Sequence, residues 1–189
     1  AYCATCDGEF FSGLDIFVIG GGYAAAEEAM YLTRYGKHVT MIIREPDFTC
    51  AKSIADKVKE HPDITIHYHT EIKKADGDDL LREATFINNQ TGEEFTYTAS
   101  EEDQTFGIFV FAGYEPATAL FKNHIELDDY GYIPTDNNMN TNVHGVFAAG
   151  DLRPKALRQI VTAVADGAIA ATAAERYVAE EKERLGIKD

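Results

Sequence analysis

The sequence predicts an α/β protein built around a Rossmann-like nucleotide-binding unit. Residues 14–43 predict, in order, a strand, a glycine turn, a helix and a second strand, which is the element order of that unit. Residues 84–98 contain a hairpin signal. Together with the strand predicted at residues 64–69, they predict a three-strand antiparallel meander. We therefore expect a parallel sheet and a smaller antiparallel sheet beside it.

The glycine turn has the pattern of a dinucleotide fingerprint. Residues 14–19, which are apolar except for Asp15, predict a buried strand, and residues 26–35 predict the helix after the turn. Gly20 permits the tight bend, Gly22 lets the backbone approach a pyrophosphate, and the small Ala25 lets helix and strand pack closely. The residues predicted to face a nucleotide are Gly20, Gly22, Tyr23, Ala24 and Ala25.

The end of the second strand, predicted at residues 38–43, does not decide between NAD and NADP as the bound nucleotide. In this fold an acidic residue there accepts the ribose 2′-OH of NAD, and basic residues accept the 2′-phosphate of NADP. The position falls at Ile43, which can do neither. Arg44 is the one basic candidate, and Glu45 beside it would repel a phosphate. The alternative is a glycine turn that no longer holds a nucleotide.

The remaining segments of the first half are short and are bounded by turn residues. They predict a helix at 51–60, strands at 64–69, 84–89 and 94–98, and a polar turn at 73–79. The sequence Asn-Gln-Thr-Gly at 89–92 is the hairpin signal between the last two strands. An acidic link at 99–104 predicts a domain boundary after residue 106.

The second half, residues 107–189, is expected to hold fewer elements. Short apolar runs at 108–111, 132–134 and 145–149 predict strands, and Gly150-Asp151 places an acid just after the last of them. A long helix follows Gln159, with small and apolar residues at helical spacing. Such a stripe suits close packing against a sheet or against a cofactor, and the pattern leaves both open.

The two cysteines at the start of the chain, Cys3 and Cys6, are spaced for a disulfide across one tight turn. Such pairs open and close readily because the motif favours the reactive thiolate. Asp7 follows the second cysteine and is placed to exchange a proton with a thiol. The alternative, half of a four-ligand zinc site, needs a second Cys/His pair, which Cys50 and the six histidines do not provide. We predict a redox disulfide, no metal, and an incidental thiol at Cys50.

The composition limits the partners. The formal net charge is −15, so phosphates would be repelled, which excludes nucleic acid and anionic membranes as expected partners. No apolar run approaches the roughly 20 residues that span a bilayer. Three cysteines are unlike a secreted disulfide framework and predict a cytoplasmic protein. The chain begins at Ala1 without methionine, and we expect it to be a fragment of a longer protein.

The order of these motifs resembles that of the low-molecular-weight bacterial thioredoxin reductases, over nearly the whole chain. The matching stretches are residues 3–8, 20–22, 145–151, 157–163 and 166–167. The resemblance implies a nicotinamide-type domain, residues 1–106, that carries the cysteine pair. It also implies that residues 107–189 are the C-terminal portion of an FAD-binding Rossmann-like domain. The FAD pyrophosphate loop lies in the portion that this chain lacks, so its FAD site is expected to be incomplete.

The resemblance also implies roles for single residues. Cys6 is the sulfur that faces the flavin, Cys3 attacks the disulfide of thioredoxin, and Asp7 is the acid. Electrons pass from a donor to FAD, then to the Cys3–Cys6 disulfide, and finally to thioredoxin. Members are usually homodimers. The FAD-binding residues implied in this chain are Gly150, Asp151, Arg158, Gln159 and Ile160.

The electron donor is where this chain departs from its family. The NADPH-dependent members have His-Arg-Arg where this chain has Ile43, Arg44 and Glu45, and a further arginine is replaced by Thr49. Some relatives use ferredoxin instead, and the pattern here resembles theirs. The sequence leaves NADPH, NADH and ferredoxin open as donors. A peroxiredoxin-reducing relative and a non-catalytic nucleotide-binding or regulatory module also stay open.

Overall fold

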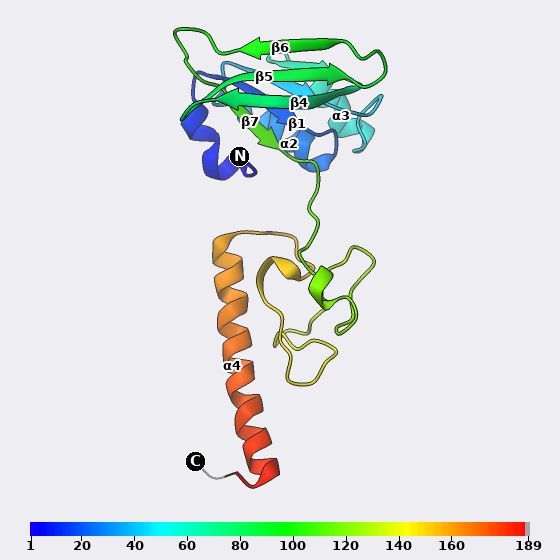
Figure 1. The fold of residues 1–189 in the computed structure, drawn as a ribbon, viewed down its shortest axis with the longest axis vertical. Coiled ribbons are helices and arrows are strands. Elements are labelled where there is room, and N and C mark those ends of the chain that lie inside the picture. Colours follow the sequence, from blue (N-terminus) through cyan, green and yellow to red (C-terminus); the bar gives the residue numbers. More distant parts are fainter. Residues whose placement is uncertain (188–189) are drawn as a thin grey trace. The chain divides into compact units, whose positions relative to one another are not determined.

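The computed structural model describes residues 1–187 and divides the chain into two compact units, Ala1–Gly113 and Tyr114–Asp189 (Figure 1). The sequence places this boundary after residue 106 instead. The difference arises because strand β7 (Gly107–Val110) pairs in parallel with β1 (Asp15–Ile19) and so belongs to the first unit. Each unit is described separately below.

The first unit contains the predicted Rossmann-like element order. Its parallel sheet has the strand order β3-β2-β1-β7, where β2 is His38–Ile42 and β3 is Ile64–His67. Helix α2 (Tyr23–Leu32) connects β1 to β2 and starts directly after the glycine turn, three residues earlier than predicted. The remaining helical elements are α1 (Ala4–Asp7), a 3-10 helix at Gly8–Phe11, and α3 (Lys52–Lys59).

Alternation along β1 builds a core on each face of the parallel sheet. Ile16 and Val18 point to one face, and Phe17 points to the other, as the two-residue repeat of a strand requires. The first face is covered by α2, whose alanines allow close approach and whose Leu32 is fully buried. Burying one leucine side chain contributes roughly 1.5–3 kcal/mol. The second face packs against the meander, where Phe17 stacks on Phe86 with ring centroids 4.9 Å apart.

The antiparallel meander is present, but its first strand is not the predicted one. It consists of β4 (Thr70–Gly77), β5 (Leu81–Asn88) and β6 (Glu94–Thr98), in that order. The prediction of a polar turn at 73–79 is wrong because β4 is an edge strand whose polar side chains face solvent. The strand predicted at 64–69 ends at His67 and joins the parallel sheet instead.

The second unit is mostly irregular, apart from helix α4 (Ile160–Leu185) and two 3-10 turns, Ala119–Phe121 and Gly150–Leu152. The strands predicted at 132–134 and 145–149 are wrong, since an isolated bridge is the one β pairing among this unit's described residues. That bridge joins Asn140 to Phe147, and its hydrogen bonds run from the Ala148 amide to the Met139 carbonyl and from the Thr141 amide to the Val146 carbonyl. A single bridge is too short to form a strand.

Helix α4 begins and ends at defined caps, as predicted after Gln159. The Gln159 side chain and Thr162 form a reciprocal capping box at its start. At its end Gly186 adopts a left-handed conformation, with φ of 67°, and its amide bonds to the carbonyl of Glu183. Among the described helices, none is long and apolar enough to cross a membrane.

Candidate redox site and cofactor-facing loops

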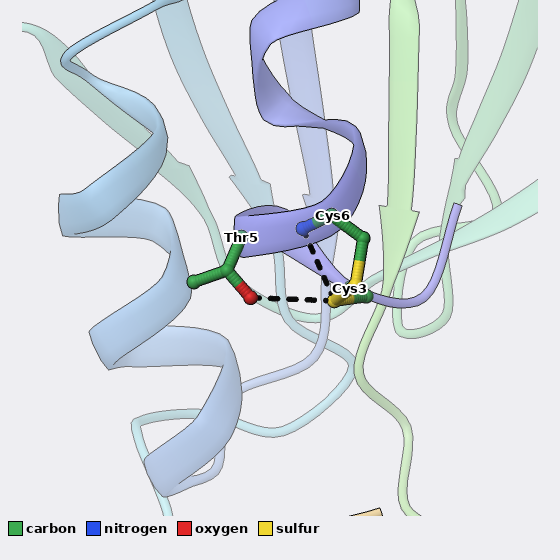
Figure 2. The surroundings of a disulfide bond; sticks show 3 residues. All are labelled: Cys3, Thr5 and Cys6. Carbon is green, nitrogen blue, oxygen red and sulfur yellow. Dashed lines mark hydrogen bonds between the residues drawn. A yellow bond between two sulfur atoms is a disulfide. The ribbon is translucent and has the colours of Figure 1, made fainter. Parts of the chain in front are cut away.

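The disulfide expected from the cysteine spacing is present. Cys3 and Cys6 are bonded, with 2.02 Å between their sulfurs and 5.3 Å between their Cα atoms. Cys3 is the N-terminal cap of α1, and its sulfur accepts a hydrogen bond of 3.2 Å from the Cys6 amide (Figure 2). Cys6 is exposed and Cys3 is partly buried, so the bond lies at the surface of the unit.

Packing on both sides fixes this turn to the sheet. The Ala1 carbonyl accepts a hydrogen bond of 2.9 Å from Val110, at the end of β7. Ala4 is 1% exposed and lies in the cluster formed by the alanines of α2. Gly8 is buried against Leu32 and Tyr35, where a Cβ atom would lie 3.2 Å from each. The redox turn is therefore supported by a rigid core.

Asp7, the predicted acid, is the last residue of α1 and is partly buried. Its charge acts on the Ala1 ammonium group: burial lowers the pKa of that ammonium, and the Asp7 carboxylate opposes the change. Its part in proton transfer stays a prediction. Within residues 1–187, no three side chains of His, Cys, Asp or Glu are grouped as a metal site would need.

The glycine turn forms the floor that a dinucleotide site needs. Gly20 has φ of 135°, and a Cβ atom there would lie 2.5 Å from the Phe111 carbonyl oxygen, so only glycine fits. Gly22 caps α2, and Tyr23 and Ala24 at the start of the helix are exposed. The structure thus places the predicted residues of this turn together at the carboxyl end of β1.

The predicted phosphate position lacks free positive charge. Arg44 is exposed, and its Nε lies 3.0 Å from the Glu45 carboxylate, which partly offsets its positive charge. Ile43 is 1% exposed, and its Cγ2 would lie 2.7 Å from a Cβ atom on Gly21. Thr49 donates its amide to the Gly21 carbonyl at 2.9 Å. The loop is closed over the glycine turn by apolar and neutral groups.

Three contacts that sequence analysis missed hold this loop, residues 44–50. The Lys59 ammonium lies 2.7 Å from the Asp47 carboxylate, and this hydrogen bond lowers the pKa of Asp47. The Asn89 side chain donates to the Arg44 carbonyl at 2.9 Å. The His69 amide donates to the Glu45 carbonyl at 3.2 Å. No motif predicts them, because the partners come from α3 and from the β-strand connections.

In the second unit, Asp166 organises the turn that carries Gly150 and Asp151. The Asp166 carboxylate accepts hydrogen bonds from the Gly150 amide and Arg153 at 2.9 Å each, and from Lys155 at 2.5 Å. Burial of this carboxyl would raise its pKa, but the three donors outweigh burial and lower it to about 2. Asp151 itself is exposed. Sequence analysis did not single out this role because the partners lie 11 to 16 residues away.

Arg158 lies next to the start of α4, with its guanidinium against two aromatic rings. Its Cζ lies 4.5 Å from the ring centre of Tyr132 and 5.9 Å from that of Tyr114. Its Nε is buried and has no hydrogen-bond partner among the described residues. Gln159 caps the helix, and Ile160 is 85% exposed. These predicted residues therefore lie together at one helix end.

The fold and the disulfide define a class of protein: a Rossmann-like unit that presents a closed cysteine pair. Residues 2–167 match the family model described as pyridine nucleotide-disulphide oxidoreductase, and the chain belongs to this family.

Individual relatives agree with this family. Thioredoxin reductase of Peptoclostridium litorale is 53% identical over 180 residues, covering 95% of this chain and 57% of the relative. Thioredoxin reductase of Peptoclostridium acidaminophilum is 54% identical over 178 residues, covering 94% and 56%. The crystal structure of thioredoxin reductase from Streptococcus pyogenes MGAS5005 has a TM-score of 0.82 at 36% identity, covering 95% and 57%. The chain thus spans just over half the length of these relatives.

Proposed function

We propose that this chain contributes to a thioredoxin-disulfide reductase, in which electrons pass from a donor through FAD to the Cys3–Cys6 disulfide and then to thioredoxin. The observation that carries the proposal is the disulfide, closed in a surface turn of a nucleotide-binding unit. Two relatives above 50% identity are named thioredoxin reductase. Those names support this function over a peroxiredoxin-reducing or a regulatory one.

The transfer to thioredoxin is a pair of thiol–disulfide exchanges. The Cys3 thiolate attacks one sulfur of the thioredoxin disulfide, and a mixed disulfide forms as the thioredoxin S–S bond breaks. Cys6 then attacks the Cys3 sulfur, which restores the Cys3–Cys6 bond and releases the thioredoxin sulfur that Cys3 had attacked, the other one having left when the mixed disulfide formed. Two electrons leave the dithiol pair, and the two thioredoxin thiolates take up protons. We assign to Asp7, the residue after Cys6, the role of taking the proton of the Cys6 thiol before this second attack.

The second unit offers groups that fit part of an FAD site. The Arg158 Nε is buried without a partner and therefore needs an acceptor. Backbone amides at the start of α4, beside Gln159 and Ile160, suit electron-rich groups. Asp151 is an exposed acceptor for ribityl hydroxyls, on the turn that Asp166 fixes through Gly150. Bound FAD would supply the electron pair that reduces the disulfide.

We assign the two units to two domains on the same basis. The unit Ala1–Gly113, which contains the glycine turn, is the nicotinamide-type domain. The unit Tyr114–Asp189 is the C-terminal portion of the FAD domain. The full-length protein is proposed to be a homodimer in the cytoplasm, as the family resemblance implies.

A ferredoxin-dependent reductase is the second candidate, and the loop at residues 44–50 favours it. A 2′-phosphate needs unpaired cations, but Arg44 is paired with Glu45. The 2′-OH of NADH needs an acceptor, but Ile43 is apolar and buried. Weak binding of both nicotinamides is therefore expected. A protein donor such as ferredoxin would require neither the contact to a 2′-phosphate nor the contact to a 2′-OH.

A single-turnover assay tests the proposed function without FAD or a donor. The chain is reduced with dithiothreitol, freed of reductant and mixed with oxidised thioredoxin. We expect one disulfide of thioredoxin to be reduced per chain, as two electrons leave the Cys3–Cys6 pair. Cys6→Ser should stop at the mixed disulfide with Cys3, whereas Cys50→Ser should behave as the parent. No transfer from the parent chain would contradict the proposal.

A further inference from the structure

The turn that holds the disulfide directs two hydrogen-bond donors at one of its sulfurs. The Cys6 amide nitrogen lies 3.2 Å from the Cys3 sulfur, and the Thr5 hydroxyl oxygen lies 3.4 Å from it (Figure 2). A sulfur in a disulfide carries no hydrogen, so the Thr5 hydroxyl is the donor in this pair. Both donors are residues of α1, and both contacts are present while the disulfide is closed.

We propose that Thr5 is a positioning residue for Cys3, whose hydroxyl stabilises the Cys3 thiolate once the disulfide is reduced. The proposal rests on the function proposed above, because it assigns a role within the same redox turn. A neutral sulfur is a weak acceptor, whereas a thiolate carries a full negative charge. Hydrogen bonds to charged acceptors are about twice as strong as neutral ones. The Thr5 contact therefore favours the form that attacks thioredoxin.

The local structure explains why a threonine suits this place. Cys3 caps α1 and Thr5 is the second residue of that helix, so its hydroxyl lies beside the cap (Figure 2). A side chain branched at Cβ has few χ1 rotamers, so little freedom is lost when the hydroxyl is held there. Thr5 is exposed, whereas its neighbour Ala4 is buried in the core. Replacing Thr5 is therefore expected to remove no packing from the core.

The test compares Thr5→Val with Thr5→Ser in the intact chain, reduced with dithiothreitol. Valine keeps the branch at Cβ and removes the hydroxyl, and serine keeps the hydroxyl. The alkylation rate of Cys3 by iodoacetamide is measured by peptide mass spectrometry from acidic to alkaline pH. Cys50 in the same molecule is the reference thiol. Thr96→Val, which removes an exposed hydroxyl from β6, is the matched control.

All variants share the same charged surroundings. The titratable groups of α1, the 3-10 helix after it, α2 and the chain start include the Cys6 thiol of the reduced chain, Asp7, Glu9, the Ala1 ammonium, Glu27, Glu28 and Tyr31. None of them is changed by substitution at residue 5. A change in the pH profile of Cys3 therefore reports the hydroxyl of Thr5.

We expect Thr5→Val to slow Cys3 alkylation at neutral pH roughly three- to tenfold, because less thiolate is present. At alkaline pH the variant should react at least as fast as the parent, since a less stabilised thiolate is a stronger nucleophile. Thr5→Ser should restore the parent profile. Cys50 and the Thr96→Val chain should show no change.

Four results would overturn the proposal. They are an unchanged Cys3 profile in Thr5→Val, a rate lowered equally at every pH, a serine variant that behaves like the valine one, and an equal shift in Thr96→Val. Failure of the proposed function is a separate result. It would appear as a parent chain that transfers no electrons to oxidised thioredoxin in the single-turnover assay.

Discussion

The two units of the chain differ in how they are held together. The unit Ala1–Gly113 has a buried apolar cluster on each face of its parallel sheet. In the unit Tyr114–Asp189, α4 leaves apolar side chains in solvent, with Ile160, Val161 and Val164 at 85, 71 and 64% exposure. Its fixed points are polar instead, above all the Asp166 carboxylate with its three donors.

This difference bears on function through local stability. Regions with little buried apolar area open more easily than cored ones, and their geometry depends on single polar contacts. The redox turn packs on the unit that has a buried apolar core, because Ala4 between the two cysteines belongs to that core. The residues proposed to face FAD lie on the unit with less core, where removing the Asp166 carboxylate would disturb the turn that carries Gly150 and Asp151. Three predictions test this contrast and a fourth concerns nicotinamide binding, in order from the largest effect to the smallest.

Phe109→Ala should have the largest effect. Phe109 is fully buried, and its ring meets that of Phe11 edge-on, with centroids 5.2 Å apart. Removing a buried phenylalanine side chain costs about 3–5 kcal/mol of the free energy of unfolding. Val164→Ala on the exposed face of α4 is the control and should change it by less than about 0.5 kcal/mol. Urea unfolding measures the free energy of unfolding of both variants. Equal losses of stability would contradict the proposed difference between the two units.

Asp166→Asn should have an intermediate effect that is confined to the second unit. Hydrogen-bond donors left without a charged acceptor cost roughly 1–3 kcal/mol. Hydrogen exchange of the Gly150 amide should quicken, while exchange in the parallel sheet stays unchanged. Loss of protection in β1 as well would show that the units are not independent.

The same carboxylate predicts a pH dependence. The hydrogen bonds lower the pKa of Asp166 from 3.8 to about 2, so the unfolded chain binds its proton more readily. Its stabilising contribution is present above pH 3.8 and is lost as the pH falls towards 2. Protection of the Gly150 amide should fall over that interval in the parent chain. In Asp166→Asn this step should be absent.

The smallest effect concerns nicotinamide binding to the first unit. NADPH should bind no more than a few-fold better than NADH, because Arg44 is paired and Ile43 is apolar. Glu45→Arg should raise the preference for NADPH about tenfold, since one charge-assisted hydrogen bond is worth roughly 1.5–3 kcal/mol. Calorimetric titration with both nucleotides measures this. A tenfold NADPH preference in the parent chain, with a micromolar constant, would disprove it.

Much of the first unit could be predicted because its signals are local. The strand, glycine turn and helix depend on residues within a few positions of one another, and so does the Cys3–Cys6 turn. The polar strand β4 escaped prediction because its lysines pair with acidic neighbours, as Lys73 does with Glu94 on β6. Such an edge strand has a polar composition that is also typical of a turn.

The second unit was harder to predict because its structure depends on distant contacts. The apolar run at 145–149 has the composition of a strand, but a strand needs a ladder of several paired residues, and this run forms one isolated bridge, between Phe147 and Asn140. The pairing of Asp166 with the Gly150 amide joins residues 16 positions apart. The helix α4 was predicted correctly because its caps and its repeat are local features.

Counting thiols tests the central claim most directly. The chain is denatured and alkylated before and after treatment with dithiothreitol, and its mass gives the number of modified cysteines. We predict one modified cysteine, Cys50, in the oxidised chain and three after reduction, since the Cys3–Cys6 disulfide opens. Three modified cysteines already in the oxidised chain would show that Cys3 and Cys6 do not form the disulfide, and the account would be wrong.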